Sequence, residues 1–204
     1  MNLNLIDLFP RTIGAAKLET LTPDVIRRAI QFIDQAEKTG LPSDGLSTKE
    51  QQILDLDFFA AVKQEVIALC KGLSQAYGHE VDDIAIANSW ANVIWRGQSI
   101  RNHRHNNSYI SGSFYLSYGS TFNITNSEYH NLFGFMPRTK ESSYRSWESF
   151  WIRPEPGAIV LFPSGLYHNV SPEQSDGNRY SVAFNAVPVG RIGVPTSLLE
   201  LRPR

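Results

Sequence analysis

From residue 84 onwards, apolar and polar side chains alternate in short runs, and this period of two restricts most of the chain to β-sheet. The segment 109–118 shows the pattern most clearly, because its two faces differ in character. One predicted face holds Tyr109, Ser111, Ser113 and Tyr115, and the other holds Ile110, Phe114 and Leu116. Further strands are expected at 84–95, 103–105, 147–153, 158–162 and 178–187. Glycine and proline predict the turns between them, for example at Pro156-Gly157.

Apolar side chains before residue 84 recur at helical spacing instead. Thr22-Pro23-Asp24 offers an N-cap hydroxyl, a proline at the first helical position and an acid in the first turn, so a helix is expected from there to about Lys38. A second amphipathic helix is predicted at about 57–76. The segment 40–50 is predicted to be a loop, and the tail 190–204 a surface extension.

Two helices followed by several strands predict an α+β chain built on a β-sandwich or jelly roll, with the helices packed on the outer face of one sheet. One or two edge strands are also expected between residues 4 and 18. No linker-like stretch separates helices from strands, and 204 residues suit one core. The chain is therefore expected to form a single domain, residues 1–204.

Charge and cysteine content narrow the class of protein. The chain has 19 Lys and Arg against 20 Asp and Glu and no basic stripe, so neither nucleic acid nor an anionic membrane is an expected partner. No run is apolar and long enough to span a bilayer, and the first residues do not resemble a signal peptide. The single cysteine, Cys70, lies in the apolar stripe of the second helix and is expected to be a buried structural thiol. These features predict a cytoplasmic location.

Two histidines one residue apart, His103 and His105, would point to the same face of an extended strand. A third histidine, His168, follows another short strand far along the chain and could complete a set of three ligands. Such a facial set leaves positions open on a non-haem iron, but imidazole also suits zinc, copper and nickel. The remaining two histidines, His79 and His130, have no comparable context.

An arginine on the last strand suggests an anion site. Arg179 shares a strand face with Ser181, opposite the apolar face of the same strand. A guanidinium fork with nearby hydroxyls, including that of Tyr115, suits a carboxylate. An internal salt bridge to an acidic side chain is the alternative explanation for Arg179.

The ordered combination of motifs resembles the Fe(II)/2-oxoglutarate-dependent oxygenase superfamily, and within it a group of small members found in bacteria and phages. The resemblance covers about residues 84–187. It rests on Trp90-x-Asn92, Gly97, His103-x-His105, Ser111-Gly112-x-Phe114-Tyr115-Leu116, Pro156-Gly157-x-Ile159-x-Leu161-Phe162-Pro163-Ser164, His168-x-Val170 and Arg179-Tyr180-Ser181-x-x-Phe184-Asn185.

The resemblance implies a double-stranded β-helix (jelly-roll) core at about 84–187, with Fe(II) and 2-oxoglutarate as cofactors. It implies that His103, His105 and His168 bind iron, and that Arg179 and Ser181 hold the far carboxylate of 2-oxoglutarate. Asn92, Tyr115 and Asn185 are carried over as further cofactor-binding residues. The sequence departs from the superfamily where His105 stands, because the usual motif has an Asp or Glu there.

The expected activity is hydroxylation of a small-molecule or peptide substrate, with release of succinate and CO2. Two alternatives remain open: a cupin-like three-histidine dioxygenase that does not use 2-oxoglutarate, and a non-catalytic jelly-roll binding module. The aromatic-rich stretch 118–151 is interpreted as a lid over the site, a subunit contact in a homodimer, or a loop packed on the core.

Overall fold

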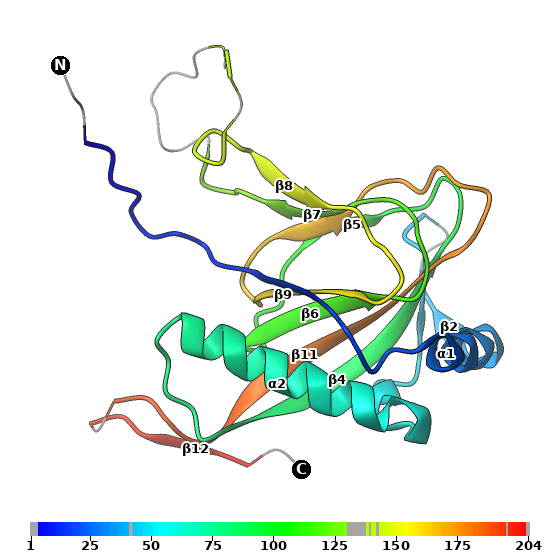
Figure 1. The fold of residues 1–204 in the computed structure, drawn as a ribbon, viewed down its shortest axis with the longest axis horizontal. Coiled ribbons are helices and arrows are strands. Elements are labelled where there is room, and N and C mark those ends of the chain that lie inside the picture. The colour runs from blue at the N-terminus through cyan, green and yellow to red at the C-terminus, as the bar shows by residue number, and fades with distance from the viewer. Residues whose placement is uncertain are drawn as a thin grey trace.

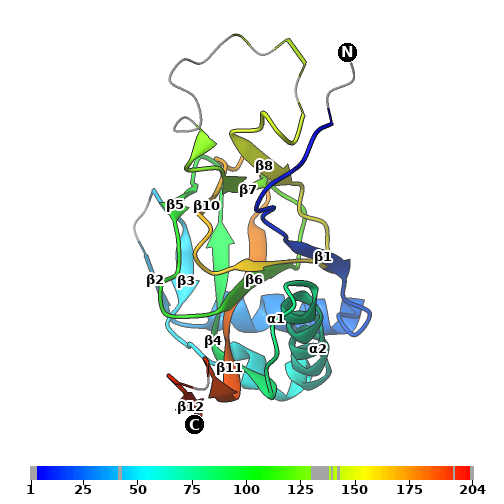
Figure 2. The ribbon, with the colours of Figure 1, turned by 90° about the vertical axis from the view of Figure 1, so that its left-hand side faces the viewer.

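The structure, a computed structural model, describes residues 4–40, 43–129, 138, 140–141, 143–194 and 196–202. Within these residues the chain forms two antiparallel sheets and two helices (Figures 1 and 2). The larger sheet contains, in order, β1 (Gly14–Lys17), β9 (Ala158–Pro163), β6 (Ile110–Tyr115), β11 (Arg179–Ile192), β4 (Asp83–Ile94), β3 (Leu46–Thr48) and β2 (Lys38–Thr39), and β12 (Leu199–Leu201) pairs with β11. The smaller sheet contains β5 (Ile100–His103), β10 (His168–Val170), β7 (Phe122–Thr125) and β8 (Ser149–Ile152). The α-helices are α1 (Pro23–Gln35) and α2 (Ala60–Ala76), with 3-10 turns η1 (Ile53–Asp55) and η2 (Asp57–Phe59) before α2.

Alternate side chains of β6 and β11 belong to two different hydrophobic clusters. Phe114 and Phe184 join a cluster that also contains buried residues of α1 and α2, and the Phe114 ring lies 5.8 Å from that of Phe59. Tyr115, the next residue along β6, joins a second cluster with Phe122 of the smaller sheet. The alternation expected for 110–116 is therefore confirmed, and it separates a helix side from a cavity side of the larger sheet.

A bulge in β4 lets this strand serve both sides. Asn185 of β11 pairs with Asn88, but Ala186 pairs with Ile86, so Ala87 is an extra residue. Without it, Ile86 and Asn88 would face the same side. With it, Ile86 packs in the helix-side cluster, while Asn88 bonds to Asn185 on the cavity side.

Both predicted helices are present, with small differences at their ends. The side chain of Thr22 accepts a hydrogen bond from the N–H of Val25, as an N-cap does, but α1 ends at Gln35 rather than near Lys38. Residues 57–59 form a 3-10 turn before α2. No helix of the described residues is long and apolar enough to span a membrane. Cys70 is buried, as predicted, and burial raises the pKa of its thiol to about 12.

Two segments predicted to lack regular structure contain short strands. The expected loop 40–50 contains β3, which with β2 forms a hairpin added to the edge of the larger sheet, where Leu46 pairs with Val93. The glycines at 40 and 45 have positive φ, which allows the chain to turn between these strands. The expected extension 190–204 contains β12, because β11 continues to Ile192 and pairs with it. Polar composition hid the β2–β3 hairpin, since edge strands need little apolar patterning.

Three further expectations need correction. His105 lies beyond the end of β5 at His103, so the two histidines do not share a strand. Tyr109 precedes β6, and its hydroxyl contacts Ser74 and His79 on the helix side rather than facing the cavity. The irregular stretch 118–151 contains β7 and most of β8, which pair with each other.

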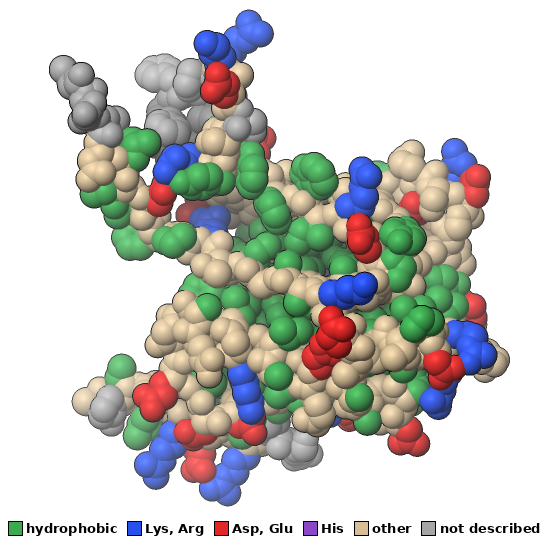
Figure 3. All heavy atoms as spheres, viewed as in Figure 1, with side chains coloured by type: hydrophobic (Ala, Val, Ile, Leu, Met, Phe, Trp, Pro, Cys, Tyr) green, Lys and Arg blue, Asp and Glu red, His purple; other side chains and the backbone are tan. Residues whose placement is uncertain are grey.

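That stretch also displays aromatic side chains on the surface. Tyr118, Tyr144, Trp147, Phe150 and Trp151 are exposed, whereas Phe122 and Tyr129 are buried. Its residues 130–137, 139 and 142, including Phe133 and Phe135, lie outside the described residues. On the face shown in Figure 3, acidic and basic side chains are interspersed, and apolar side chains gather near the smaller sheet.

Candidate metal and anion site

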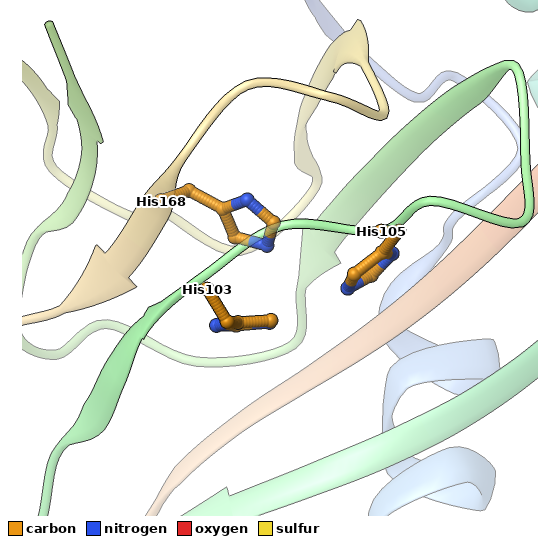
Figure 4. Close-up of side chains that lie close together, drawn as sticks. All are labelled: His103, His105 and His168. Atoms are coloured by element: carbon orange, nitrogen blue, oxygen red, sulfur yellow. The ribbon is translucent and has the colours of Figure 1, made fainter. Parts of the chain in front are cut away.

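The three histidines lie together at the end of the smaller sheet where β5 ends and β10 begins. His103 ends β5 and pairs with His168, the first residue of β10. The backbone N–H of His105 donates to the carbonyl oxygen of Ser164 at 2.9 Å, which holds the loop after β5 against the larger sheet. One nitrogen from each ring lies within 4.8 Å of the others (Figure 4). No other His, Cys, Asp or Glu of the described residues joins this group.

Each imidazole uses its Nδ1 atom for a contact inside the protein. Nδ1 of His103 lies 2.8 Å from the carbonyl oxygen of Arg101, and Nδ1 of His168 lies 3.0 Å from that of Leu166. A carbonyl only accepts, so both Nδ1 atoms carry the proton and both Nε2 atoms keep a free lone pair. The rings are therefore in the form that binds a metal through Nε2.

Burial favours the neutral form of these rings. His168 is 5% exposed, and burial lowers its pKa to about 3, with the neighbouring His103 and His105 acting in the same direction. Burial is also the main reason why the pKa of His105 is lowered. Neutral imidazole is the ligand form, so a metal need displace no proton from these two rings at neutral pH.

At the other end of the same cavity lies a buried arginine. Arg179 is 1% exposed, and its Nε donates to the carbonyl oxygen of Ser120 at 3.2 Å, while Nη1 donates to Oγ of Ser181 at 3.3 Å. It forms no ion pair with any described acidic side chain. Burial lowers its pKa, since the charged form loses solvation. The alternative of an internal salt bridge is thus not what the described residues show.

Tyr115 belongs to the same end. Its hydroxyl is buried and has no hydrogen-bond partner among the described residues. Its ring centroid lies 5.2 Å from Cζ of Arg179, although Tyr115 is not among the residues that line the cavity. Burial raises the pKa of the phenol, which therefore stays a neutral donor. A buried hydroxyl without a partner is costly, and a ligand oxygen would satisfy it.

Glu173 supports the arginine without pairing with it. Its carboxylate accepts from the backbone N–H groups of Ser120, Gln174 and Ser175 at 2.8–2.9 Å. Although burial opposes ionisation, these hydrogen bonds lower its pKa overall. Gly119 permits this arrangement, because a Cβ there would come within 2.7 Å of both Arg179 and Glu173. The carboxylate fixes the loop whose carbonyl receives Arg179.

The cavity between these ends has a volume of about 350 Å³. Its lining includes His103, His105, His168, Arg179, Ser181, Asn92, Trp90, Asp44, Ser47, Arg101, Phe122 and Phe162. Asn92, a predicted cofactor-binding residue, accepts from Oγ of Ser47 at 2.7 Å. Asn185, predicted for the same role, lies behind His105 rather than in the cavity lining, and contacts its Nδ1.

Several site residues escaped the sequence analysis. Ser47 and Asp44 line the cavity but lie in the segment mistaken for a loop, so nothing linked them to the histidines. Asn88 and Glu173 act through other residues, and no spacing rule identifies such positions.

Three histidines at one end of a cavity and a buried arginine at the other combine a set of candidate metal ligands with a candidate anion site. Residues 88–185 match the family model described as "Putative 2OG-Fe(II) oxygenase". The resemblance noted in the sequence is thereby confirmed. A search of the curated proteins yields no match.

Solved structures agree in fold. The epimerase SnoN from nogalamycin biosynthesis, described as non-haem and α-ketoglutarate dependent, has a TM-score of 0.63 at 10% identity over 95% of this chain and 89% of its own. A Pseudomonas putida prolyl-4-hydroxylase has a TM-score of 0.60 at 14% identity, covering 88% and 94%. HygX from Streptomyces hygroscopicus, solved with nickel, 2-oxoglutarate and hygromycin B, has a TM-score of 0.58 at 12% identity, covering 87% and 83%.

Proposed function

We propose that the protein is an Fe(II)- and 2-oxoglutarate-dependent dioxygenase that hydroxylates a small-molecule or peptide substrate. One oxygen atom of O2 enters the substrate C–H bond as hydroxyl, and the other enters succinate as 2-oxoglutarate loses CO2. The observation that carries the proposal is Arg179: a buried cation that forms no salt bridge with a described acidic side chain, in the same cavity as a three-histidine group. Such a cation calls for an anionic ligand, since a lone buried charge is costly.

The donor set fits iron. His103, His105 and His168 would hold the metal through Nε2, since one ring nitrogen of each lies within 4.8 Å of the others. Three neutral ligands leave the full charge of a divalent ion uncompensated, and a dianionic co-substrate offsets it. When bound, the metal and 2-oxoglutarate would supply the activation of oxygen.

The chain's own residues would position the co-substrate and exclude water. Arg179, Ser181 and the free hydroxyl of Tyr115 form a donor set for the far carboxylate. Ala183 lies on the cavity side of β11 between Ser181 and Asn185, and its small side chain leaves space in the cavity for the co-substrate. The Phe122 and Phe162 rings close one wall beside His168, at 5.5 and 4.7 Å between ring centroids.

The substrate would approach over the rim formed by the β2–β3 hairpin and Trp90. The Trp90 ring lies 5.9 Å from that of His105, and Asp44 pairs with Arg101 at 2.7 Å on the opposite side. This rim combines one aromatic face with polar groups, which is compatible with either a small molecule or a peptide.

Solved relatives in fold include a prolyl-4-hydroxylase and an epimerase, so the outcome of oxidation needs its own test. Purified protein would be incubated with Fe(II), 2-oxoglutarate and O2 while succinate is quantified, with and without pools of candidate substrates. Hydroxylated product in step with succinate is expected. Oxygen consumption without succinate would favour the cupin-like dioxygenase, and metal binding without either would favour the binding module.

Broader assignments belong to the same proposal. The chain would act as one cytoplasmic domain, with α1 and α2 covering the outer face of the larger sheet. The exposed aromatic side chains between residues 118 and 151 would form a lid or a homodimer contact.

A further inference from the structure

His105 differs from the other two histidines in what holds its ring. His103 and His168 each donate Nδ1–H to a backbone carbonyl two residues earlier in the chain. His105 follows β5 in a loop, and its Nδ1 instead lies 2.6 Å from Oδ1 of Asn185 and 3.1 Å from Oγ of Ser111. Its orientation thus depends on side chains of β11 and β6.

The amide of Asn185 is itself fixed, and this decides which atom faces the imidazole. Its Nδ2 donates to Oδ1 of Asn88 at 2.9 Å. Its Oδ1 accepts from Oγ of Ser111 at 2.7 Å. With Nδ2 bonded to Asn88, the amide oxygen faces His105, and because an amide oxygen only accepts, the ring donates from Nδ1 in this arrangement.

The sheet places these groups in one row. Asn88, Asn185 and Ser111 are direct cross-strand partners on β4, β11 and β6. The bulge at Ala87 turns Asn88 to the cavity side, which is required for it to reach Asn185. Oγ of Ser111 also contacts Oγ of Ser164, the residue that follows β9, so the row is connected to the end of that strand.

From this row we infer that Asn185 is the positioning residue of His105: its side-chain oxygen holds the imidazole as the Nδ1-protonated tautomer and aims Nε2 at His103 and His168. Asn185 would thus act through His105, whereas the sequence predicted a direct cofactor contact for it. The tautomer matters because an imidazole that is protonated at Nε2 has no lone pair on the nitrogen that faces His103 and His168. The inference rests on the proposed metal site.

The test uses the full chain with ¹⁵N-labelled histidine, first without metal. Long-range ¹H–¹⁵N correlation distinguishes the two tautomers ring by ring. In the unaltered protein all three cluster histidines are expected to be protonated at Nδ1. In Asn185→Leu, His105 should lose this signature, whereas His103 and His168 should keep it, because their acceptors are backbone carbonyls. Asn185→Asp retains an acceptor oxygen and should restore the signature.

Fe(II) affinity, measured anaerobically by competition with a chelator, gives the second readout. Asn185→Leu should weaken binding by about 10- to 100-fold, the usual effect of removing a hydrogen-bond partner of a ligating histidine. Asn185→Asp should bind at least as tightly as the unaltered protein. Thr48→Val, which removes another buried, hydrogen-bonded side chain away from the cavity, is the matched control and should leave affinity unchanged.

Unchanged Fe(II) affinity in Asn185→Leu, or a His105 ring that remains protonated at Nδ1 there, would overturn the inference. So would an unaltered protein in which His105 is protonated at Nε2, a result that needs no variant to fold. If the unaltered protein shows the expected tautomers but binds no Fe(II), the proposed function fails while the positioning contact stands. Asn185→Val, smaller and suited to a strand, substitutes for Asn185→Leu if the latter does not fold.

Discussion

The two faces of the larger sheet are built from the same strands but treat polar groups differently. On the helix side, Phe114 and Phe184 pack with α1 and α2 in a continuous apolar cluster. On the cavity side, Arg179 forms no salt bridge and the Tyr115 hydroxyl no hydrogen bond within the part of the chain that the structure describes. On the helix side, apolar side chains of the chain pack against one another. On the cavity side, a guanidinium group and a hydroxyl remain available to bind a ligand.

The comparison predicts which substitutions should lower stability and which should lower ligand affinity. Substitutions on the helix side should cost stability, because the contacts there are made on folding. Substitutions at the anion end should cost ligand affinity with little loss of stability, because among the described residues the Tyr115 hydroxyl has no hydrogen-bond partner and Arg179 forms no salt bridge. This division can be tested from both sides.

The largest effect is expected for Arg179→Leu. Removing a buried partner of the co-substrate carboxylate should weaken 2-oxoglutarate binding by about 2–5 kcal/mol, at least thirtyfold. Calorimetric titration of the metal-loaded protein without oxygen measures it. The free energy of unfolding of the ligand-free protein should stay the same or rise, since an unpaired buried cation is lost.

Arg96→Leu provides the control, because Arg96 is an exposed arginine that pairs with Asp176 just beyond the end of β4. Arg96→Leu should change neither the affinity for 2-oxoglutarate nor the free energy of unfolding appreciably. A fall of 3 kcal/mol or more in the stability of Arg179→Leu, as expected for a broken buried ion pair, would assign Arg179 a structural role instead.

Gly112→Ala tests the helix side of β6. The added Cβ would lie 2.4 Å from Cζ of Phe184 and 2.8 Å from the carbonyl oxygen of Val160, so we expect a loss of about 2 kcal/mol in the free energy of unfolding. Urea unfolding measures the change. Gly72→Ala, in α2 with no atom within 4 Å of the new Cβ, should instead gain about 0.5–1 kcal/mol. Equal stabilities of the two variants would show that the sheet accommodates the methyl group.

Glu173→Gln has the smallest expected effect and a defined pH dependence. The folded state lowers the pKa of Glu173 below its ordinary value of 4.5, so this carboxylate stabilises the fold above that pH and stops doing so as the pH falls through the lowered value. At pH 7 the free energy of unfolding of the variant should be about 1 kcal/mol lower than that of the unaltered protein. This difference should disappear in acid.

Urea unfolding at pH 7 and at lower pH gives the comparison. Glu128→Gln, an exposed carboxylate paired with Arg11, should show a change of about 0–1 kcal/mol and serves as the control. A gap for Glu173→Gln that widens in acid would contradict the assignment.

Much of this arrangement could be predicted from local patterns. Alternation along 110–116 and 179–185 correctly separated helix-side from cavity-side residues, and the cap at Thr22 located α1. The three histidines were identified by type and spacing, although the reason given for His103 and His105 was wrong, because β5 ends between them. Their convergence comes from the pairing of His103 with His168 and from the Ser164 carbonyl.

What the sequence could not reveal depends on contacts between distant segments. The β2–β3 hairpin is polar and is held by β4, so its contribution of Ser47 to the cavity has no local signal. The role of Asn185 likewise depends on a bulge in another strand. Such features follow from strand register, which period-two patterning does not specify on a polar face.

The central claim is that one cavity holds iron at its histidine end and the co-substrate carboxylate at its arginine end. Anaerobic titration of the metal-free protein with Fe(II) and then 2-oxoglutarate, followed by visible charge-transfer absorption, tests it most directly. The band should appear in the unaltered protein, be absent in His168→Ala, and require far more 2-oxoglutarate in Arg179→Leu. Tight Fe(II) binding with no band at any 2-oxoglutarate concentration would contradict the claim.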